Sequence, residues 1–79
     1  MGTEERERAI LELLSESGLA LPPKVIYVNL KIRGATFSER TVHRRLSALL
    51  ERGLVEKPPE KEDYYRISEA GGEYLDERL

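Results

Sequence analysis

The spacing of apolar residues changes at Gly53, and this change limits the folds that the chain can adopt. Before Gly53, apolar residues recur at the period of an amphipathic helix. After it come two short segments rich in β-forming residues, 54–57 and 64–67, separated by the polar loop 58–63. We therefore expect a mainly α-helical fold with a small β-hairpin.

Two helices are predicted in the first part of the chain. The first covers residues 3–17, with Thr3 as its N-cap and Gly18 as the residue that stops it. The second covers residues 23–30 and starts with proline, which suits a first helical turn because it lacks an N–H group. Residues 31–35 are expected to break this helix.

The third helix, about residues 38–52, has the clearest end signals. Ser38 is a good N-cap, Phe37 can pack on Val42 as a hydrophobic staple, and Gly53 suits the left-handed residue that ends a helix. Its apolar stripe consists of Val42, Leu46, Leu49 and Leu50. The opposite face carries Arg40, Arg44 and Ser47, with Thr41 and Arg45 on its flank.

Ser68 can cap a short last helix over residues 69–78, in which Gly71 and Gly72 weaken the first turn. The resulting order is helix, helix, helix, hairpin, helix. This is the order of a winged helix-turn-helix fold, and we expect one such domain over residues 3–79.

Length and composition restrict how the domain is stabilised. A chain of 79 residues buries a thin core, about 60% of the surface that its unfolded form exposes. The absence of Cys excludes disulfides and thiolate metal sites, and the single histidine, His43, cannot form a histidine-rich one. We expect no cofactor, and stability from helix packing or self-association.

The N-terminal residues are charged and lack the apolar core of a signal peptide, and no apolar run approaches the length of a membrane span. The sequence therefore predicts a cytoplasmic protein with no membrane contact.

The charge balance argues mildly against a partner rich in phosphate, because 13 Lys and Arg against 15 Asp and Glu give a net charge of −2. The distribution is uneven, however. Residues 39–45 carry three arginines, one histidine and a single acid, whereas residues 68–79 carry four acids and one arginine. We expect a polarised molecule with one basic face.

Several segments resemble a known family. Residues 38–46 and 51–57 resemble the recognition helix and first wing strand of many prokaryotic winged-helix regulators. Residues 64–71 are similar to the second strand and turn of archaeal regulators like the haloarchaeal phage phi-H repressor, and residues 21–23 and 29–30 fit the same group. The resemblance covers nearly the whole chain and implies a DNA-binding transcriptional regulator, most simply a repressor.

The functional hypothesis is that the third helix enters the major groove of double-stranded DNA. Arg40 and Arg44 can contact phosphates or make paired hydrogen bonds to guanine, while Ser38 and Thr41 suit phosphate or thymine-methyl contacts near the helix start. Ser47 lies on the same face. The alternative for these residues is a solvated helix face; the winged-helix element order favours DNA.

Two residues of this helix leave alternatives open. Arg45 either contacts a phosphate or pairs with an acid of the first helix. His43 lies beside the apolar stripe and is expected to be a packing or surface residue rather than a pH switch.

The hairpin 54–67 is expected to act as a wing, with Lys57, Lys61 and Arg66 as candidate backbone contacts. Because acids surround Lys61 in the loop, we expect the wing to contribute little. The tyrosines at 64, 65 and 74 have spacings that favour packing over base stacking.

The sequence gives less support to other functions. An enzyme is not expected, since the chain has no Cys nucleophile, no glycine-rich phosphate loop and no Gly-x-Ser-x-Gly elbow. The main alternative is a winged-helix module that binds proteins and not DNA, which the net charge favours. The sequence indicates no small-molecule ligand and does not define an operator.

A homodimer is predicted from the small size of the domain and from the two half-sites of many operators. The first and last helices are the expected contact surface, because they lie away from the basic face. The candidate interface residues are Ile10, Leu14, Tyr74 and Leu75. A monomer is the alternative.

Overall fold

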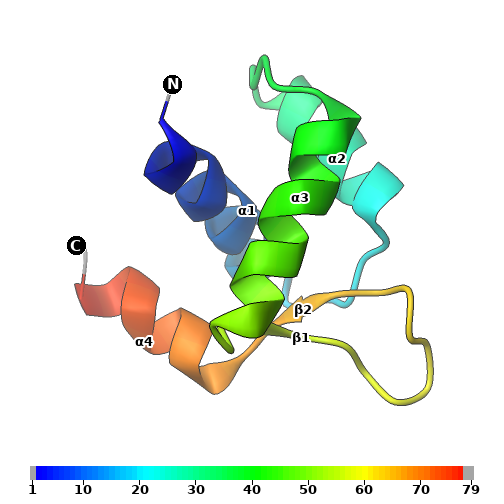
Figure 1. Cartoon of the computed structure of the whole chain (residues 1–79), viewed down its shortest axis with the longest axis vertical. Coiled ribbons are helices and arrows are strands. Elements are labelled where there is room, and N and C mark those ends of the chain that lie inside the picture. The colour runs from blue at the N-terminus through cyan, green and yellow to red at the C-terminus, as the bar shows by residue number, and fades with distance from the viewer. Residues whose placement is uncertain (1, 78–79) are drawn as a thin grey trace.

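The computed structural model describes residues 2–77 and has the predicted element order. Four helices and one hairpin form within these residues: α1 (Thr3–Ser17), α2 (Pro23–Ile32), α3 (Glu39–Glu51), β1 (Val55–Glu56), β2 (Arg66–Ile67) and α4 (Glu69–Glu77). In Figure 1, α3 crosses in front of α1 and α2, and the loop between the strands projects to the lower right. The mainly helical fold with a two-stranded antiparallel hairpin is confirmed. Arg78, the predicted end of the last helix, and the predicted domain end at 79 lie outside the described residues.

The first helix has the predicted length but a different N-cap. Gly2 is the N-cap, with extended backbone, and Thr3 is already the first helical residue, so the prediction of Thr3 as the cap was wrong. The N–H of Gly2 donates to Oε1 of Glu5 at 3.3 Å, so a side chain of the first turn satisfies the backbone N–H of the cap residue. Gly18 ends the helix with φ 65°, as predicted.

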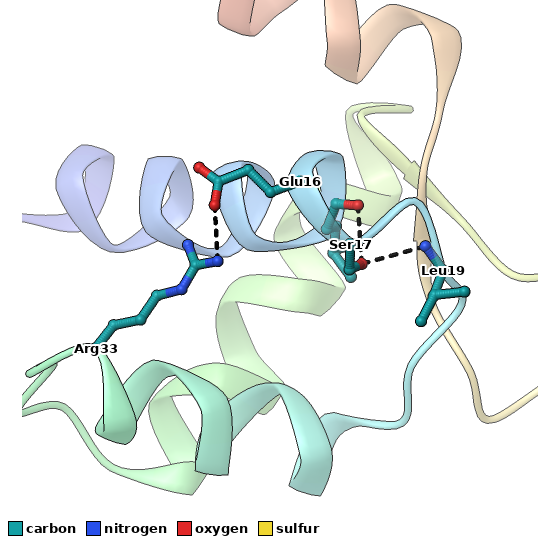
Figure 2. Close-up of polar contacts among 5 residues, drawn as sticks. Glu16, Ser17, Leu19 and Arg33 are labelled. Atoms are coloured by element: carbon teal, nitrogen blue, oxygen red, sulfur yellow. Dashed lines mark hydrogen bonds and ion pairs between the residues drawn. The ribbon is translucent and has the colours of Figure 1, made fainter.

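The link from α1 to α2 is fixed by short-range polar contacts (Figure 2). The hydroxyl of Ser17 donates to the carbonyl of Leu14 at 3.1 Å and accepts from the N–H of Leu19 at 3.2 Å. Beside it, Nη2 of Arg33 lies 2.7 Å from Oε1 of Glu16, so an ion pair joins the C-terminal ends of the two helices.

The second helix is longer than predicted. It continues through Lys31 and Ile32, which were expected to break it. It ends at Ile32 with Arg33 as its C-cap, and Gly34 follows with φ 99°. There the N–H of Gly34 donates to the carbonyl of Lys31 and that of Ala35 to the carbonyl of Leu30, both at 2.9 Å. The break therefore comes from the left-handed glycine and not from the residues before it.

The third helix begins and ends as predicted. The side chain of Ser38 accepts a hydrogen bond from the N–H of Thr41 at 3.2 Å. At the other end Gly53 has φ 75°, and the N–H of Leu54 donates back to the carbonyl of Leu49 at 3.0 Å. The two caps fix the length of the helix and the direction in which the chain leaves it.

The hairpin is shorter than predicted and has an additional partner. Only Val55–Glu56 and Arg66–Ile67 pair, because the loop closes through two successive turns at 58–61 and 61–64. Tyr65 instead pairs with Leu21 in the link between α1 and α2, through two backbone hydrogen bonds of 2.8 Å. The base of the hairpin is thus attached to the helical core.

The turn into α4 explains its glycine. The hydroxyl of Ser68 accepts from the N–H of Gly71 at 3.0 Å and donates to the carbonyl of Gly53 at 2.6 Å. A Cβ at position 71 would collide with the carbonyl oxygen of Leu54 and lie 2.8 Å from Cγ1 of Ile67. Gly71 is therefore required by the close approach of two backbones.

The core lies between the helices and the base of the hairpin. Its buried apolar side chains come from every helix and from the hairpin, and the fully buried ones are Ile10, Leu11, Leu14, Ile26, Val42, Leu46, Leu49 and Val55. The large apolar side chains that stay exposed lie on α2 and the link before it: Leu19, Val25, Val28 and Ile32. Within residues 2–77, no helix is long and apolar enough to cross a membrane.

Candidate nucleic-acid interface

The face of α3 that points away from the core carries the predicted contact residues. Arg40, Arg44 and Ser47 are exposed and recur at helical spacing, and Glu51 follows them at the end of the helix. The buried side chains Val42, Leu46 and Leu49 occupy the opposite face. The amphipathic pattern therefore holds the two arginines outward.

Arg40 and Arg44 differ from most other arginines in their electrostatic surroundings. Within residues 2–77 neither makes a hydrogen bond or an ion pair. The paired arginines and their carboxylates are Arg8 with Glu12, Arg33 with Glu16, Arg45 and Arg52 with Glu7, and Arg66 with Glu56. The outward face of α3 thus carries two full positive charges that no neighbouring acid neutralises.

Arg45 is held on the flank of α3 by a buried carboxylate. Its Nη1 lies 3.1 Å from Oε2 of Glu7, and Nη1 of Arg52 lies 2.8 Å from Oε1 of the same side chain. Glu7 is only 5% exposed. Of the two alternatives left open for Arg45, the structure contains the ion pair with the first helix.

The importance of Glu7 was not anticipated from the sequence. It is one of several acids in the first turns of α1, and nothing in the pattern distinguishes it from the exposed ones. The available signal was on the other helix, where Arg45 and Arg52 lie seven residues apart and so share one flank.

The N-terminal end of α3 is exposed to solvent around its cap. The hydroxyl of Ser38 donates to Oγ1 of Thr41 at 3.2 Å while accepting the N–H of the same residue, so both predicted contact residues belong to the cap. A helix N-terminus attracts anions. His43 lies on the surface, with Nε2 at 3.6 Å from Oε2 of Glu39.

In the hairpin, two of the three predicted contact residues are paired with acids, unlike Arg40 and Arg44 on α3. Nε of Arg66 lies 2.6 Å from Oε2 of Glu56, and Nζ of Lys61 lies 3.8 Å from Oδ1 of Asp63. Lys57 is exposed and its Nζ lies 5.2 Å from the centre of the Tyr65 ring. Internal partners therefore weaken the positive potential of the wing.

An open hollow separates the wing from the helices. It measures about 560 Å³ and is lined by Pro22, Pro23, Lys24, Glu39, His43, Lys57, Glu62, Asp63 and Tyr65. Lys24 on this surface was not among the predicted contact residues. Cations and acids both line the hollow, so its net charge is small compared with that of the outward face of α3.

Two of the three tyrosines at 64, 65 and 74 pack against the core. Tyr65 packs against the core and pairs with Leu21, and Nζ of Lys61 lies 5.7 Å from the centre of the Tyr64 ring. Tyr74 packs against the core on α4, with the guanidinium of Arg52 5.4 Å from its ring centre. The positions of Tyr65 and Tyr74 agree with the packing interpretation, whereas Tyr64 is not among the side chains packed against the core.

The predicted dimer residues belong to the core of a single chain. Ile10 and Leu14 are 0% exposed, so placing them at an interface was wrong. Leu75 is 8% exposed, and Tyr74 is half-buried against the same core. The physical reason is that α2, α3, α4 and β2 all pack on α1 within the chain, so the apolar stripe that was assigned to a partner is covered internally.

The three-helix core, the outward basic face of the third helix and the hairpin that follows it define a winged-helix protein. Residues 8–75 match the model of the ribonuclease R winged-helix domain, and the chain belongs to that family. No curated protein matches the sequence significantly.

Among solved structures, the fold is similar to that of a transcriptional regulator from Clostridium thermocellum. The TM-score is 0.75 at 23% sequence identity, and the alignment covers 91% of this chain and 74% of the other. This likeness establishes the winged-helix fold.

Proposed function

We propose that this protein is a transcriptional regulator that binds double-stranded DNA by placing the N-terminal half of α3 in the major groove. The observation that carries the proposal is the pair Arg40 and Arg44, exposed, unpaired within the described residues, and held outward by the core stripe behind them. The width of the major groove admits an α-helix, and arginine bonds both to phosphates and to base edges.

The electrostatics support an orientation as well as a contact. Arg40 and Arg44 lie in the first two turns of α3, where the helix dipole is also positive, whereas Glu51 lies in its last turn. A phosphate backbone attracts the first part of this face and repels the last. The helix therefore enters the groove with its N-terminal end first.

The wing takes a minor part in this proposal. Lys57 is its one predicted cation without a carboxylate partner in residues 2–77, and it lies beside the mixed-charge hollow. We infer that it approaches the DNA backbone beside the groove that α3 occupies. A repressor role is supported by the resemblance of residues 21–23, 29–30 and 64–71 to archaeal regulators like the haloarchaeal phage phi-H repressor.

We also propose that the chain acts as a homodimer on DNA, since two linked half-sites multiply the affinity of one small recognition helix. Light scattering on the free protein and on a duplex complex gives the mass of each. A single chain bound to each duplex at saturation contradicts this part of the proposal.

The DNA-binding experiment is a titration of random-sequence duplex with the full chain across a salt series. The parent protein should bind and should weaken steeply as salt rises, because phosphate contacts release counterions. The double variant Arg40→Ala/Arg44→Ala should lose most of the affinity.

A matched control removes the same charge elsewhere. The double variant Arg8→Ala/Arg33→Ala loses two arginines from outside α3, one half-buried and one exposed, both paired with acids. It should retain affinity close to that of the parent. If both double variants lose affinity equally, general charge and not α3 accounts for binding; if the parent does not bind at low salt, the proposal fails.

A second candidate function, a protein-binding module, is favoured by the exposed apolar side chains of α2. Val25 and Val28 are 38% and 42% exposed and Ile32 is 77% exposed. Single exposed apolar residues are common, but a row on one helix is typical of contact surfaces. This function becomes the leading one if DNA binding is absent.

A further inference from the structure

The two unpaired arginines of α3 also restrict which DNA sequence the helix can recognise. In the major groove, guanine presents two acceptors, N7 and O6, that match the forked donors of one arginine. Adenine presents a donor beside its N7, and thymine presents one acceptor beside a methyl group. An arginine that is not already bonded to a carboxylate therefore discriminates in favour of guanine.

The remaining side chains on this face add little competing preference. Ser47 is short, and a hydroxyl bonds to several bases. Arg45 is held toward α1 by Glu7, so its guanidinium is not directed at bases. Ser38 and Thr41 bond to each other at the helix start. Sequence preference on this face therefore depends mainly on Arg40 and Arg44.

The spacing of the two arginines sets the spacing of the bases. Four residues of helix separate their Cα atoms by about 6 Å along the axis. Successive base pairs are about 3.4 Å apart, so this distance corresponds to one or two base-pair steps, depending on the tilt of the helix in the groove. Glu51, the last residue of α3, is repelled by the phosphates and opposes closer approach of the C-terminal part of the helix to the DNA. The DNA sequence that the helix contacts is therefore short.

We propose that the preferred half-site of this protein contains two guanines within three consecutive base pairs, one contacted by Arg40 and the other by Arg44. This inference rests on the proposed function, because it requires α3 to lie in the major groove. It names the DNA sequence class that the site selects and goes beyond general affinity for duplex DNA.

The test uses a set of short duplexes with constant A·T flanks and every possible central triplet, titrated with the full chain by fluorescence anisotropy. Duplexes with two guanines in the triplet should bind about a hundredfold more tightly than those with none, since each of the two paired arginine–guanine contacts discriminates by roughly tenfold. Replacing those guanines by 7-deazaguanine should remove most of the difference, because it deletes the N7 acceptor and leaves the charge unchanged.

A pair of variants assigns the contacts. Gln pairs with adenine through N6 and N7, so Arg40→Gln and Arg44→Gln should each shift the preference at one position of the triplet from guanine to adenine. Arg8→Gln, a matched change on α1, should leave the ranking of the duplexes as in the parent. A change of base preference is a result that mere loss of stability does not produce.

The outcomes separate this inference from the proposed function. If the parent binds every duplex equally and weakens steeply with salt, it is a DNA-binding protein and the guanine inference is wrong. If the tightest duplexes lack paired guanines, or if neither Gln variant changes the ranking, the inference is also overturned. If no duplex binds, the proposed function and the inference fail together.

Discussion

Nη1 of Arg45 on α3 lies 3.1 Å from Oε2 of Glu7 on α1, although the two residues are 38 positions apart in the chain. Arg52 shares the same carboxylate and lies over the ring of Tyr74 on α4. A single buried acid therefore connects the first helix with the third and, through Arg52, with the fourth. The helix proposed to bind DNA is held in place from behind by this contact.

Glu7→Gln should lower the free energy of unfolding by about 1–3 kcal/mol, because a neutral amide leaves two arginines without their shared counter-charge. Denaturant unfolding followed by circular dichroism measures the change. Glu12→Gln is the matched control: Glu12 forms an i,i+4 pair with Arg8, its side chain is 43% exposed, and its loss should cost about 0.5 kcal/mol or less. Equal effects of the two changes would show that the buried contact does not stabilise the fold.

Arg45→Ala should mainly reduce stability and Arg44→Ala should mainly reduce DNA affinity, although the residues are neighbours. The first removes a partner of Glu7 and should reduce stability by about 1–2 kcal/mol. The second removes an exposed side chain and should change stability by about 0.5 kcal/mol or less, while reducing DNA affinity. Thermal unfolding and anisotropy on the same preparations test both; a large loss of stability in Arg44→Ala would contradict the assignment.

Gly71→Ala should destabilise the protein by about 2–3 kcal/mol, because the new methyl group meets the carbonyl oxygen of Leu54 and Cγ1 of Ile67. Gly72 provides a control one position further along α4, since a methyl group there would have nothing within 4 Å. Gly72→Ala should stabilise by about 0.5–1 kcal/mol through helix propensity. A comparison of melting temperatures decides, and a neutral Gly71→Ala would mean that the two backbones can separate at little cost.

Ser38→Ala should reduce stability by about 1 kcal/mol, since the N–H of Thr41 loses its acceptor at the start of α3. The change tests whether the cap fixes the end of the helix that carries Arg40. Ser47→Ala, on the exposed face of the same helix, should alter stability by less than about 0.5 kcal/mol. Amide hydrogen exchange of the first turn of α3 should increase only in Ser38→Ala.

The helices could be predicted because their determinants are local. Apolar spacing located α1 and α3, Ser38 identified one helix start, and Gly18 and Gly53 identified two helix ends. Local signals also misled where two residues compete for one role, as when Gly2 and not Thr3 capped α1.

The long-range contacts could not be predicted in the same way. The pairing of Leu21 with Tyr65 joins the link between α1 and α2 to the residue just before β2. No local sequence pattern indicates this pairing. For the candidate site, the outward placement of Arg40 and Arg44 follows from the helical period. The pairing of Arg45 with Glu7, which holds Arg45 against α1, depends instead on which acid α1 places beside α3 when the helices pack. Ile10 and Leu14 were misassigned because an apolar stripe does not indicate whether its cover comes from the same chain.

The hydrogen bond of 2.6 Å from Ser68 to the carbonyl of Gly53 closes the chain into a ring at the base of the hairpin. Leu54 and Val55 on one side of the loop, and Tyr65 and Ile67 on the other, lie in or against the core. Tyr65 also pairs with Leu21, whereas residues 59–63 between them are exposed. Because the entropy of closing a loop changes only slowly with its length, the segment at the tip can be exchanged at little energetic cost. The length and charge of the loop at the tip of the wing can therefore change, in evolution or by design, while α3 keeps its position.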